Sequence, residues 1–271
     1  MKHKAYVNGH SLQKLQRDFS FAKGNPKDFS GIKCISFLEM GKIRTYPGKE
    51  ETMDMKKPEK YPDKTSRRLL LFWLVYFISF FILDTGIPAE KCHVIHCLPD
   101  DWIPFCEWFL IPYVFWYFCL GGITLYTMIR DETVFHSFMY YLILTSAAAL
   151  ALYVLYPSRQ ELRPSYFSRD NTLTAAVRLL YKVDTNTNVF PSLHVLHTFG
   201  ILSAGLRAKG LEHWGWKCFF VVTSVLICLS TVFLKQHSVL DVFLALPISV
   251  LSERICYGGY TWMNCLKRKT A

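Results

Sequence analysis

Long apolar runs constrain the fold of this 271-residue chain more than any other feature, and 51% of its residues are hydrophobic. Two of these runs, residues 193–206 and 239–257, are weaker and have polar groups near their starts. The other four are each long enough to cross a bilayer core of about 30 Å, and they cover residues 69–88, 109–129, 138–156 and 214–234. The sequence therefore predicts an all-α fold, a polytopic transmembrane helical bundle of about six spans within residues 67–257.

Basic residues are distributed unevenly, and residues 1–66 carry 14 Lys and Arg against 8 Asp and Glu. No nucleic-acid-binding motif accompanies this charge, so we expect a poorly ordered cytoplasmic leader and no nucleic-acid partner. The stretch that begins at Met53 and Met55 looks like a natural start, which leaves the role of residues 1–52 open. Residues 258–271 are expected to form a short basic cytoplasmic tail.

The positive-inside rule orients the predicted spans. Arg67 and Arg68 precede the first run, and alternation from there places Arg130 and the basic C-terminal residues on the same, cytoplasmic side. The loop of residues 157–189 then faces outward, although it carries several basic residues, namely Arg159, Arg163, Arg169, Arg178 and Lys182. A basic loop on that side indicates an anionic ligand there. We expect a multi-pass plasma-membrane protein with both termini in the cytoplasm.

Two short polar islands, residues 190–194 and 235–241, each open one of the weaker runs, and each contains a histidine. In the second island His237 and Asp241 are four residues apart, a spacing that places both side chains on one face of a helix. The carboxylate can accept a hydrogen bond from one imidazole nitrogen and leave the other as a nucleophile. The alternative is a His–Asp pair that only joins helices, but ionisable groups within spans usually mark functional sites.

The first island is typical of a helix start. Ser192 is a good capping residue, and free backbone N–H groups in the first turn form an anion site. His194 in that turn can donate a proton to a leaving alkoxide. The alternative is a capped helix with a histidine at the membrane interface. His197 shares the face of His194, and we expect it to pack or to give polar support.

Charged side chains outside the two histidines are candidates for binding phosphate. Arg163 precedes a proline and is therefore held in an extended conformation, and its planar guanidinium suits bidentate contact with phosphate oxygens. Lys235 can add a second positive charge close to His237. Arg159 is a weaker candidate, for which a solvated loop charge is the alternative. Asp184 could orient Arg163 or contact a head group.

The ordered motifs Arg-Pro, Pro-Ser-x-His and His-x-x-x-Asp resemble those of the type-2 phosphatidic acid phosphatase superfamily, and the resemblance covers residues 67–257. It implies a helical bundle that needs no metal or other cofactor. By this resemblance His237 is the nucleophile that forms a phosphohistidine and Asp241 is its orienting carboxylate. His194 protonates the leaving group, while Arg163 and the backbone near Ser192 hold the phosphoryl oxygens.

The chain departs from the family pattern at two positions. Tyr156, a further weak site candidate, stands where the family has a lysine, and Ser230-Thr231 stands where it has Ser-Arg; Lys235 could replace the missing charge. The resemblance implies hydrolysis of a phosphatidate-like or polyprenyl-(di)phosphate-like lipid at the outer membrane face. Phe-Pro-Ser-Leu-His is similar to the inositol phosphorylceramide synthase branch, so a lipid phosphotransferase is the alternative. A non-catalytic protein that binds or transports anionic lipids is an alternative of another class.

Nine cysteines are present, and three of them lie with two histidines in the first outward loop, at Cys92, His93, His96, Cys97 and Cys106. Their spacing matches no zinc pattern. We therefore expect incidental thiols or a disulfide rather than a metal site.

Overall fold

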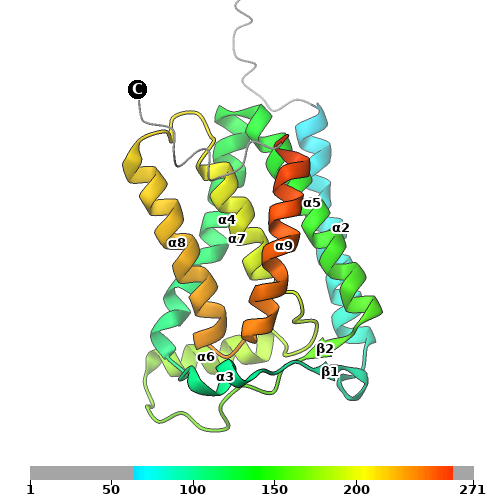
Figure 1. Ribbon diagram of the computed structural model, residues 1–271, viewed down its shortest axis with the longest axis vertical. Helices are drawn as coiled ribbons and strands as arrows, with labels where there is room; N and C mark the ends of the chain where they lie inside the picture. Colours follow the sequence, from blue (N-terminus) through cyan, green and yellow to red (C-terminus); the bar gives the residue numbers. More distant parts are fainter. Residues whose placement is uncertain (1–63, 259–271) are drawn as a thin grey trace, which may run out of the picture. The chain divides into compact units, whose positions relative to one another are not determined.

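The computed structural model describes residues 64–258, which belong to one compact unit, Lys56–Ala271. Almost all of the predicted leader, with the alternative starts at Met53 and Met55, lies outside the described residues, as does the predicted tail beyond Gly258. The described part is mostly helical, and its long helices form a bundle (Figure 1). The predicted all-α class is therefore confirmed for this part of the chain.

The α-helices are α2 (Lys64–Gly86), α3 (Leu98–Trp102), α4 (Leu110–Arg130), α5 (Glu132–Leu155), α6 (Thr172–Val183), α7 (Leu193–Gly205), α8 (Trp214–Phe233) and α9 (Val239–Cys256). Two short 3-10 helices, η2 (Ala89–Lys91) and η3 (Glu107–Phe109), and two short strands, β1 (His93–Val94) and β2 (Ser158–Arg159), lie in the connections.

Four segments of the described chain are long and apolar enough to cross a membrane, namely Lys64–Leu83, Glu107–Arg130, Glu132–Leu155 and Trp214–Phe233. They fall on α2, α4, α5 and α8, and they coincide with four of the predicted runs, which are therefore confirmed as helices of spanning length. α7 has 13 residues, about 20 Å at 1.5 Å per residue, which is short of the bilayer core. α9 carries Asp241, Glu253 and Arg254 within its 18 residues. The number six is therefore not confirmed.

The short helix α7 lies at the centre of the bundle, in contact with α4, α5, α8 and α9. As expected for an enclosed helix, its side chains are buried nearly all round, polar ones such as His197 and Thr198 included. Gly200 permits close approach of α5, since a Cβ atom there would lie 2.8 Å from the ring of Tyr141. Gly205 permits close approach of α8 in the same way, since a Cβ atom there would lie 2.6 Å from the Phe220 ring. This packing fixes the start of α7, which carries the first polar island.

The connections between the long helices gather at two ends of the bundle. β1, β2, α3 and α6 lie together at the lower end in Figure 1, and β1 pairs with β2 in parallel. Both polar islands lie at this end, where the Ser192 backbone N–H donates to the Asp241 carbonyl at 3.3 Å. At the other end the Lys209 backbone N–H donates to the Asp131 carboxylate at 3.1 Å. The islands therefore share one end, as the alternation of spans predicts.

The predicted loop of residues 157–189 is not entirely loop, because it contains α6. Asn171 is its N-cap and accepts a hydrogen bond from the Thr174 backbone N–H at 2.9 Å, while the Thr174 hydroxyl accepts from the Asn171 backbone N–H at 2.9 Å. Val177 is buried one turn later. This reciprocal cap, followed by apolar residues at helical spacing, is a signal from which the helix could have been predicted.

Candidate active site

The backbone around His237 is held in a tight turn between α8 and α9. The Thr231 carbonyl accepts hydrogen bonds from the backbone N–H groups of both Gln236 and His237, each at 3.0 Å. Lys235 closes the turn in the left-handed region, with φ of 55°. Ser238 then caps α9 by accepting from the Leu240 backbone N–H at 3.2 Å. The position of His237 is thus set by backbone contacts on both sides of it.

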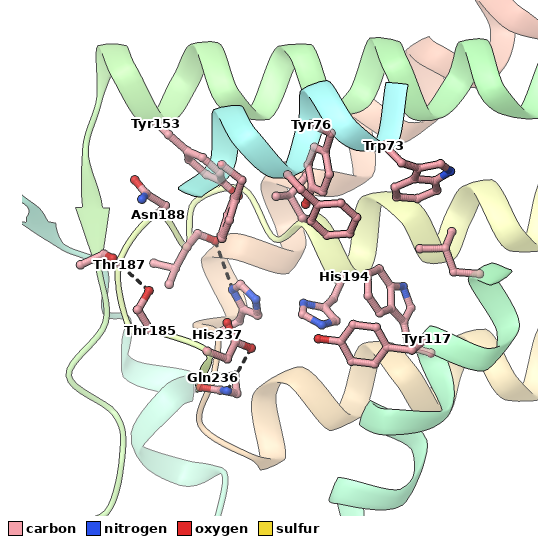
Figure 2. Close-up of a pocket in the computed structure, with 17 residues that line it drawn as sticks. Trp73, Tyr76, Tyr117, Tyr153, Thr185, Thr187, Asn188, His194, Gln236 and His237 are labelled. Atoms are coloured by element: carbon pink, nitrogen blue, oxygen red, sulfur yellow. Dashed lines mark hydrogen bonds between the residues drawn. The ribbon is translucent and has the colours of Figure 1, made fainter. Parts of the chain in front are cut away.

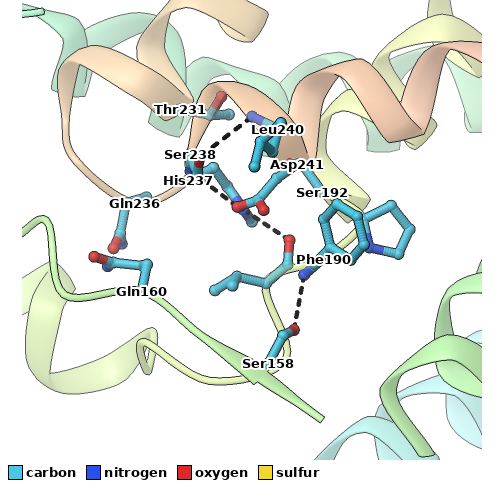
Figure 3. Close-up of polar contacts among 12 residues, drawn as sticks. Ser158, Gln160, Phe190, Ser192, Thr231, Gln236, His237, Ser238, Leu240 and Asp241 are labelled. Atoms are coloured by element: carbon cyan, nitrogen blue, oxygen red, sulfur yellow. Dashed lines mark hydrogen bonds and ion pairs between the residues drawn. The ribbon is translucent and has the colours of Figure 1, made fainter. Parts of the chain in front are cut away.

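The imidazole of His237 has two acceptors at one nitrogen. Its Nδ1 lies 3.1 Å from Asp241 Oδ2 and 3.1 Å from the Val189 carbonyl oxygen (Figure 3). A nitrogen between two acceptors must carry the proton, so Nδ1 donates and Nε2 keeps its lone pair. The predicted His–Asp pair therefore exists, and its geometry leaves the other ring nitrogen available as a nucleophile.

Asp241 is fully buried in the first turn of α9. Its Oδ2 also accepts from the Ser238 backbone N–H at 2.9 Å, which completes a capping box. One carboxylate therefore both caps the start of α9 and holds the His237 ring. Because that carboxylate is itself held by the helix backbone, the orientation of the His237 ring follows from the start of α9.

His194 lies in the first turn of α7, as predicted, and Ser192 is the N-cap residue. The His194 ring packs between aromatic side chains, 4.5 Å from the Tyr113 ring and 4.4 Å from the Trp116 ring between centroids. Its centroid is 5.9 Å from that of His237. His194 Nε2 is buried and has no hydrogen-bond partner among the described residues. The two predicted catalytic histidines are thus brought together.

A cavity of about 170 Å³ lies beside both histidines (Figure 2). One wall is apolar and comes from α2 and α4, with Trp73, Phe77, Phe80, Trp116 and Leu120 among its residues. The opposite wall is polar and comes from the turns before α7 and α9, with Asp184, Thr185, Thr187, Asn188 and Gln236. None of the described residues that line it is a lysine or an arginine.

Arg163 does not line this cavity but lies directly behind its polar wall. Its guanidinium donates to the carbonyls of Tyr181, Asp184 and Thr185 at 2.9, 2.7 and 2.8 Å. It also donates to Gln236 Oε1 at 2.5 Å. The predicted bidentate contact with phosphate is therefore not preformed, because both terminal nitrogens of the guanidinium already hold the segment before α7 and the Gln236 side chain.

Lys235 is also turned away from the cavity. Its Nζ donates to the Asp100 carbonyl at 2.6 Å and lines a separate outer cavity together with His96 and Glu161. Burial lowers the pKa of Lys235, against the opposing effect of Asp100 and Asp101. The sequence placed Lys235 beside His237 by proximity in the chain, but the left-handed turn directs the side chain elsewhere.

The weaker candidates are distributed over different places. Asp184 lines the cavity and accepts hydrogen bonds from the Tyr113 hydroxyl and from Gln236 Nε2, the latter at 3.2 Å. Tyr156 stacks on His93, with centroids 4.4 Å apart, outside the cavity. Arg159 pairs with Glu161 at 2.8 Å and likewise does not line the cavity. Of the three, only Asp184 is at the site.

Sequence reasoning missed several residues of the cavity. Gln236 connects Arg163 to Asp184, although its position next to His237 was a usable signal. The side-chain amide of Asn188 also lines the cavity, and it is buried without a hydrogen-bond partner among the described residues. Nothing in the sequence marks the aromatic residues of α2 and α4 as cavity residues, because an aromatic ring inside an apolar run most often only packs in the core.

The Cys/His cluster of the first connection does not assemble a metal site. Among residues 64–258, no group of three or more His, Cys, Asp or Glu side chains is placed to hold a metal ion. Cys92, Cys97 and Cys106 are free thiols in this structure. His96 instead hydrogen-bonds Asp101 at 2.9 Å, and this bond raises the pKa of His96.

Comparison with protein-family models, with curated proteins and with solved structures found no match to this chain.

Proposed function

We propose that the protein is an integral membrane phosphoryl-transfer enzyme that hydrolyses lipid phosphate monoesters through a phosphohistidine on His237. The observation that carries the proposal is the state of that ring, whose Nδ1 is held by Asp241 and Val189 while His194 lies across the cavity. A fixed tautomer with one free nitrogen is what nucleophilic catalysis requires. The motif resemblance to type-2 phosphatidic acid phosphatases is in accord with it.

The first step transfers the phosphoryl group to the enzyme. His237 Nε2 attacks phosphorus, a P–N bond forms, and the P–O bond to the lipid breaks. The proton of a protonated His194 goes to the departing alkoxide, so the lipid leaves as an alcohol. Asp241 offsets the positive charge that develops on the His237 ring. The backbone N–H groups of Leu193 and His194, in the first turn of α7, are candidate donors for phosphoryl oxygens, because both residues line the cavity.

The second step regenerates the enzyme. Neutral His194 takes a proton from water, the oxygen attacks phosphorus, and the P–N bond breaks to release phosphate and neutral His237. With a phosphodiester donor, His237 would instead take up a phospho-head-group, and an acceptor alcohol in place of water would then give a new phosphodiester, which is the phosphotransferase alternative. The two outcomes are distinguished by whether product forms without an acceptor.

The cavity supports an amphiphilic substrate. Its apolar wall consists of side chains from α2 and α4, two of the helices long enough to cross a membrane. Its polar wall and both histidines belong to the end of the bundle where the connections gather. A lipid phosphate can therefore place its chain along the spans and its phosphate at the histidines. We propose that this end faces the outside of a plasma membrane.

A non-catalytic protein that binds anionic lipid is the second candidate, and one observation favours it. No lysine or arginine is among the described residues that line the cavity, and Asp184 adds a carboxylate. An enzyme for phosphate dianions usually offsets charge with basic side chains. In the catalytic proposal, phosphate must instead rely on backbone donors and on Arg163 behind the wall.

The test is phosphate release from a panel of lipid phosphates in detergent with EDTA, together with trapping of phosphohistidine. We expect release and trapping by the wild type and neither by His237→Ala. His96→Ala is the matched control, since His96 is an exposed histidine at the same end of the bundle. Trapping from a phosphodiester donor, with a new phosphodiester formed only after an alcohol acceptor is added, would establish the phosphotransferase. Lipid binding without trapping would establish the binding protein.

A further inference from the structure

Asp100 of α3 meets the start of α9 at close range, although 138 residues separate it from Ser238. It is almost completely buried, with 1% of its surface exposed. Its Oδ2 accepts from the Ser238 hydroxyl at 2.6 Å, and its Oδ1 accepts from the Val239 backbone N–H at 2.8 Å. One carboxylate therefore bonds the two residues that directly follow His237.

These contacts satisfy groups that α9 cannot satisfy by itself. The Val239 N–H is in the first turn, where backbone donors lack intrahelical acceptors. The Ser238 hydroxyl has a single proton, and giving it to Asp100 turns the oxygen lone pairs toward the Leu240 N–H. A negative charge at this position also complements the helix dipole. Asp100 thus determines how α9 begins.

Asp100 is itself held rigidly within the first connection. The Cys97 backbone N–H donates to its Oδ2 at 2.8 Å, as the cap of α3. Lys235 Nζ donates to its main-chain carbonyl at 2.6 Å. The turn that carries His237 is therefore tied to α3 on both sides of the histidine, through Lys235 before it and through Ser238 and Val239 after it.

We propose that Asp100 is a positioning residue that fixes the start of α9 and thereby holds His237 at its reacting position. The proposal rests on the proposed function, because it concerns the same nucleophile. Asp100 contacts neither the cavity nor the histidine ring. It acts through Ser238 and Val239, which lie between it and the Asp241 carboxylate that orients the ring.

The variant Asp100→Asn keeps the size of the side chain but replaces one acceptor oxygen with a donor. That NH₂ group would face the Val239 N–H or the donors to Oδ2, so at least one contact is lost. Asp101→Asn is the matched control, because it makes the same change at the next residue. The Asp101 side chain is 57% exposed and bonds His96 rather than α9.

The experiment uses the full-length protein in detergent with a radiolabelled lipid phosphate, and it measures the rate of phosphohistidine formation per trapped site. Hydrogen exchange of the peptide covering residues 236–242 is followed in parallel. For Asp100→Asn we expect faster exchange and a rate lower by about 10- to 100-fold, the scale of an ångström-sized misplacement. KM and the number of trapped sites should stay close to wild type. Asp101→Asn should match wild type in every measurement.

A merely structural role gives a different result, because a partly misfolded variant has fewer trapped sites that react at the wild-type rate. That result would overturn the proposal, and so would exchange and rates equal to those of wild type. A wild type that forms no phosphohistidine would overturn the proposed function and this proposal with it. A reactive wild type beside an unaffected Asp100→Asn would overturn this proposal alone.

Discussion

The two histidines of the cavity are held in opposite ways. His237 is held by hydrogen bonds, with Asp241 and Val189 at its Nδ1 and its backbone tied to Thr231. His194 is held by shape, between the rings of Tyr113 and Trp116, and its Nε2 has no hydrogen-bond partner among the described residues. Their rings are nevertheless only 5.9 Å apart between centroids.

The difference matches what the two proposed roles require. A nucleophile needs one tautomer, and two acceptors at Nδ1 enforce it. A general acid–base must exist in both protonation states during one turnover, and a strong partner would favour one of them. Packing fixes the direction of the His194 ring without a partner that holds the proton, while burial lowers the pKa of His194 and favours the neutral ring. The contrast also indicates which perturbation should harm each residue.

The largest of the following effects is expected from His194→Ala. Loss of a positioned acid–base should lower the rate of turnover by about 100- to 10,000-fold for an alkyl phosphate. An aryl phosphate with the same apolar chain has a better leaving group and needs less protonation. For that ester we expect phosphohistidine to form and then to accumulate, because the second step still lacks its base. Equal losses for both esters in rapid-mixing experiments would contradict the assigned role.

A smaller effect is expected from Asp241→Asn, which removes charge from the support of His237 while keeping its size. A hydrogen bond to a charged group contributes about 1.5–3 kcal/mol, which corresponds to about 10- to 100-fold in rate. The measurement is the rate of phosphohistidine formation per trapped site. A change of less than about twofold would show that the Val189 carbonyl alone orients the ring.

Arg163→Lys separates a structural role of Arg163 from a phosphate-binding role. An ammonium cannot reproduce the planar set of contacts to three carbonyls and Gln236. We expect a loss of about 1.5–3 kcal/mol of stability, seen as a lower Tm in detergent, with KM unchanged. Arg169→Lys is the control, since Arg169 is 69% exposed and exposed pairs contribute little. A raised KM with an unchanged Tm would support the role that the sequence predicted.

The smallest expected effect is the pH dependence of the stability that Asp100 contributes. Burial acts to raise the pKa of Asp100, but hydrogen bonds from Ser238, Val239 and Cys97 outweigh it and hold the pKa below the ordinary 3.8. A lowered pKa stabilises the folded state above pH 3.8, and the contribution is lost as pH falls through the lowered value. The Tm difference between wild type and Asp100→Asn should therefore shrink below pH 3.8. A difference independent of pH would contradict an ionised Asp100.

Much of the fold follows from local sequence, and much of the site does not. Hydropathy identified the runs that became α2, α4, α5 and α8, because each long run is a property of one segment. The i to i+4 spacing predicted the contact of His237 with Asp241 for the same reason. These predictions needed no knowledge of what lies across the bundle.

The contacts of Arg163 and Lys235 could not be predicted because their partners are distant in sequence, and the phosphate contacts proposed for both side chains stay predictions. Arg163 donates to carbonyls 18 to 22 residues later, and Lys235 donates to a carbonyl 135 residues earlier. Backbone carbonyls are present in every segment and leave no pattern in the sequence. A basic side chain near a candidate catalytic histidine therefore predicts a phosphate contact only when no backbone carbonyl already accepts its hydrogen bonds.

The polar wall of the cavity places the Asp184 carboxylate and uncharged groups in front of a cation, since Arg163 donates to the Asp184 and Thr185 carbonyls and to Gln236 from behind. Attraction between charges weakens with distance, and added salt changes affinity most where counterions are displaced by direct contact. Recognition of a substrate by this site should consequently depend on chain length, at about 0.8 kcal/mol for each buried CH₂ group. Two lipid phosphates that differ only in their chains would then be separated in KM, while high ionic strength would leave both nearly unchanged.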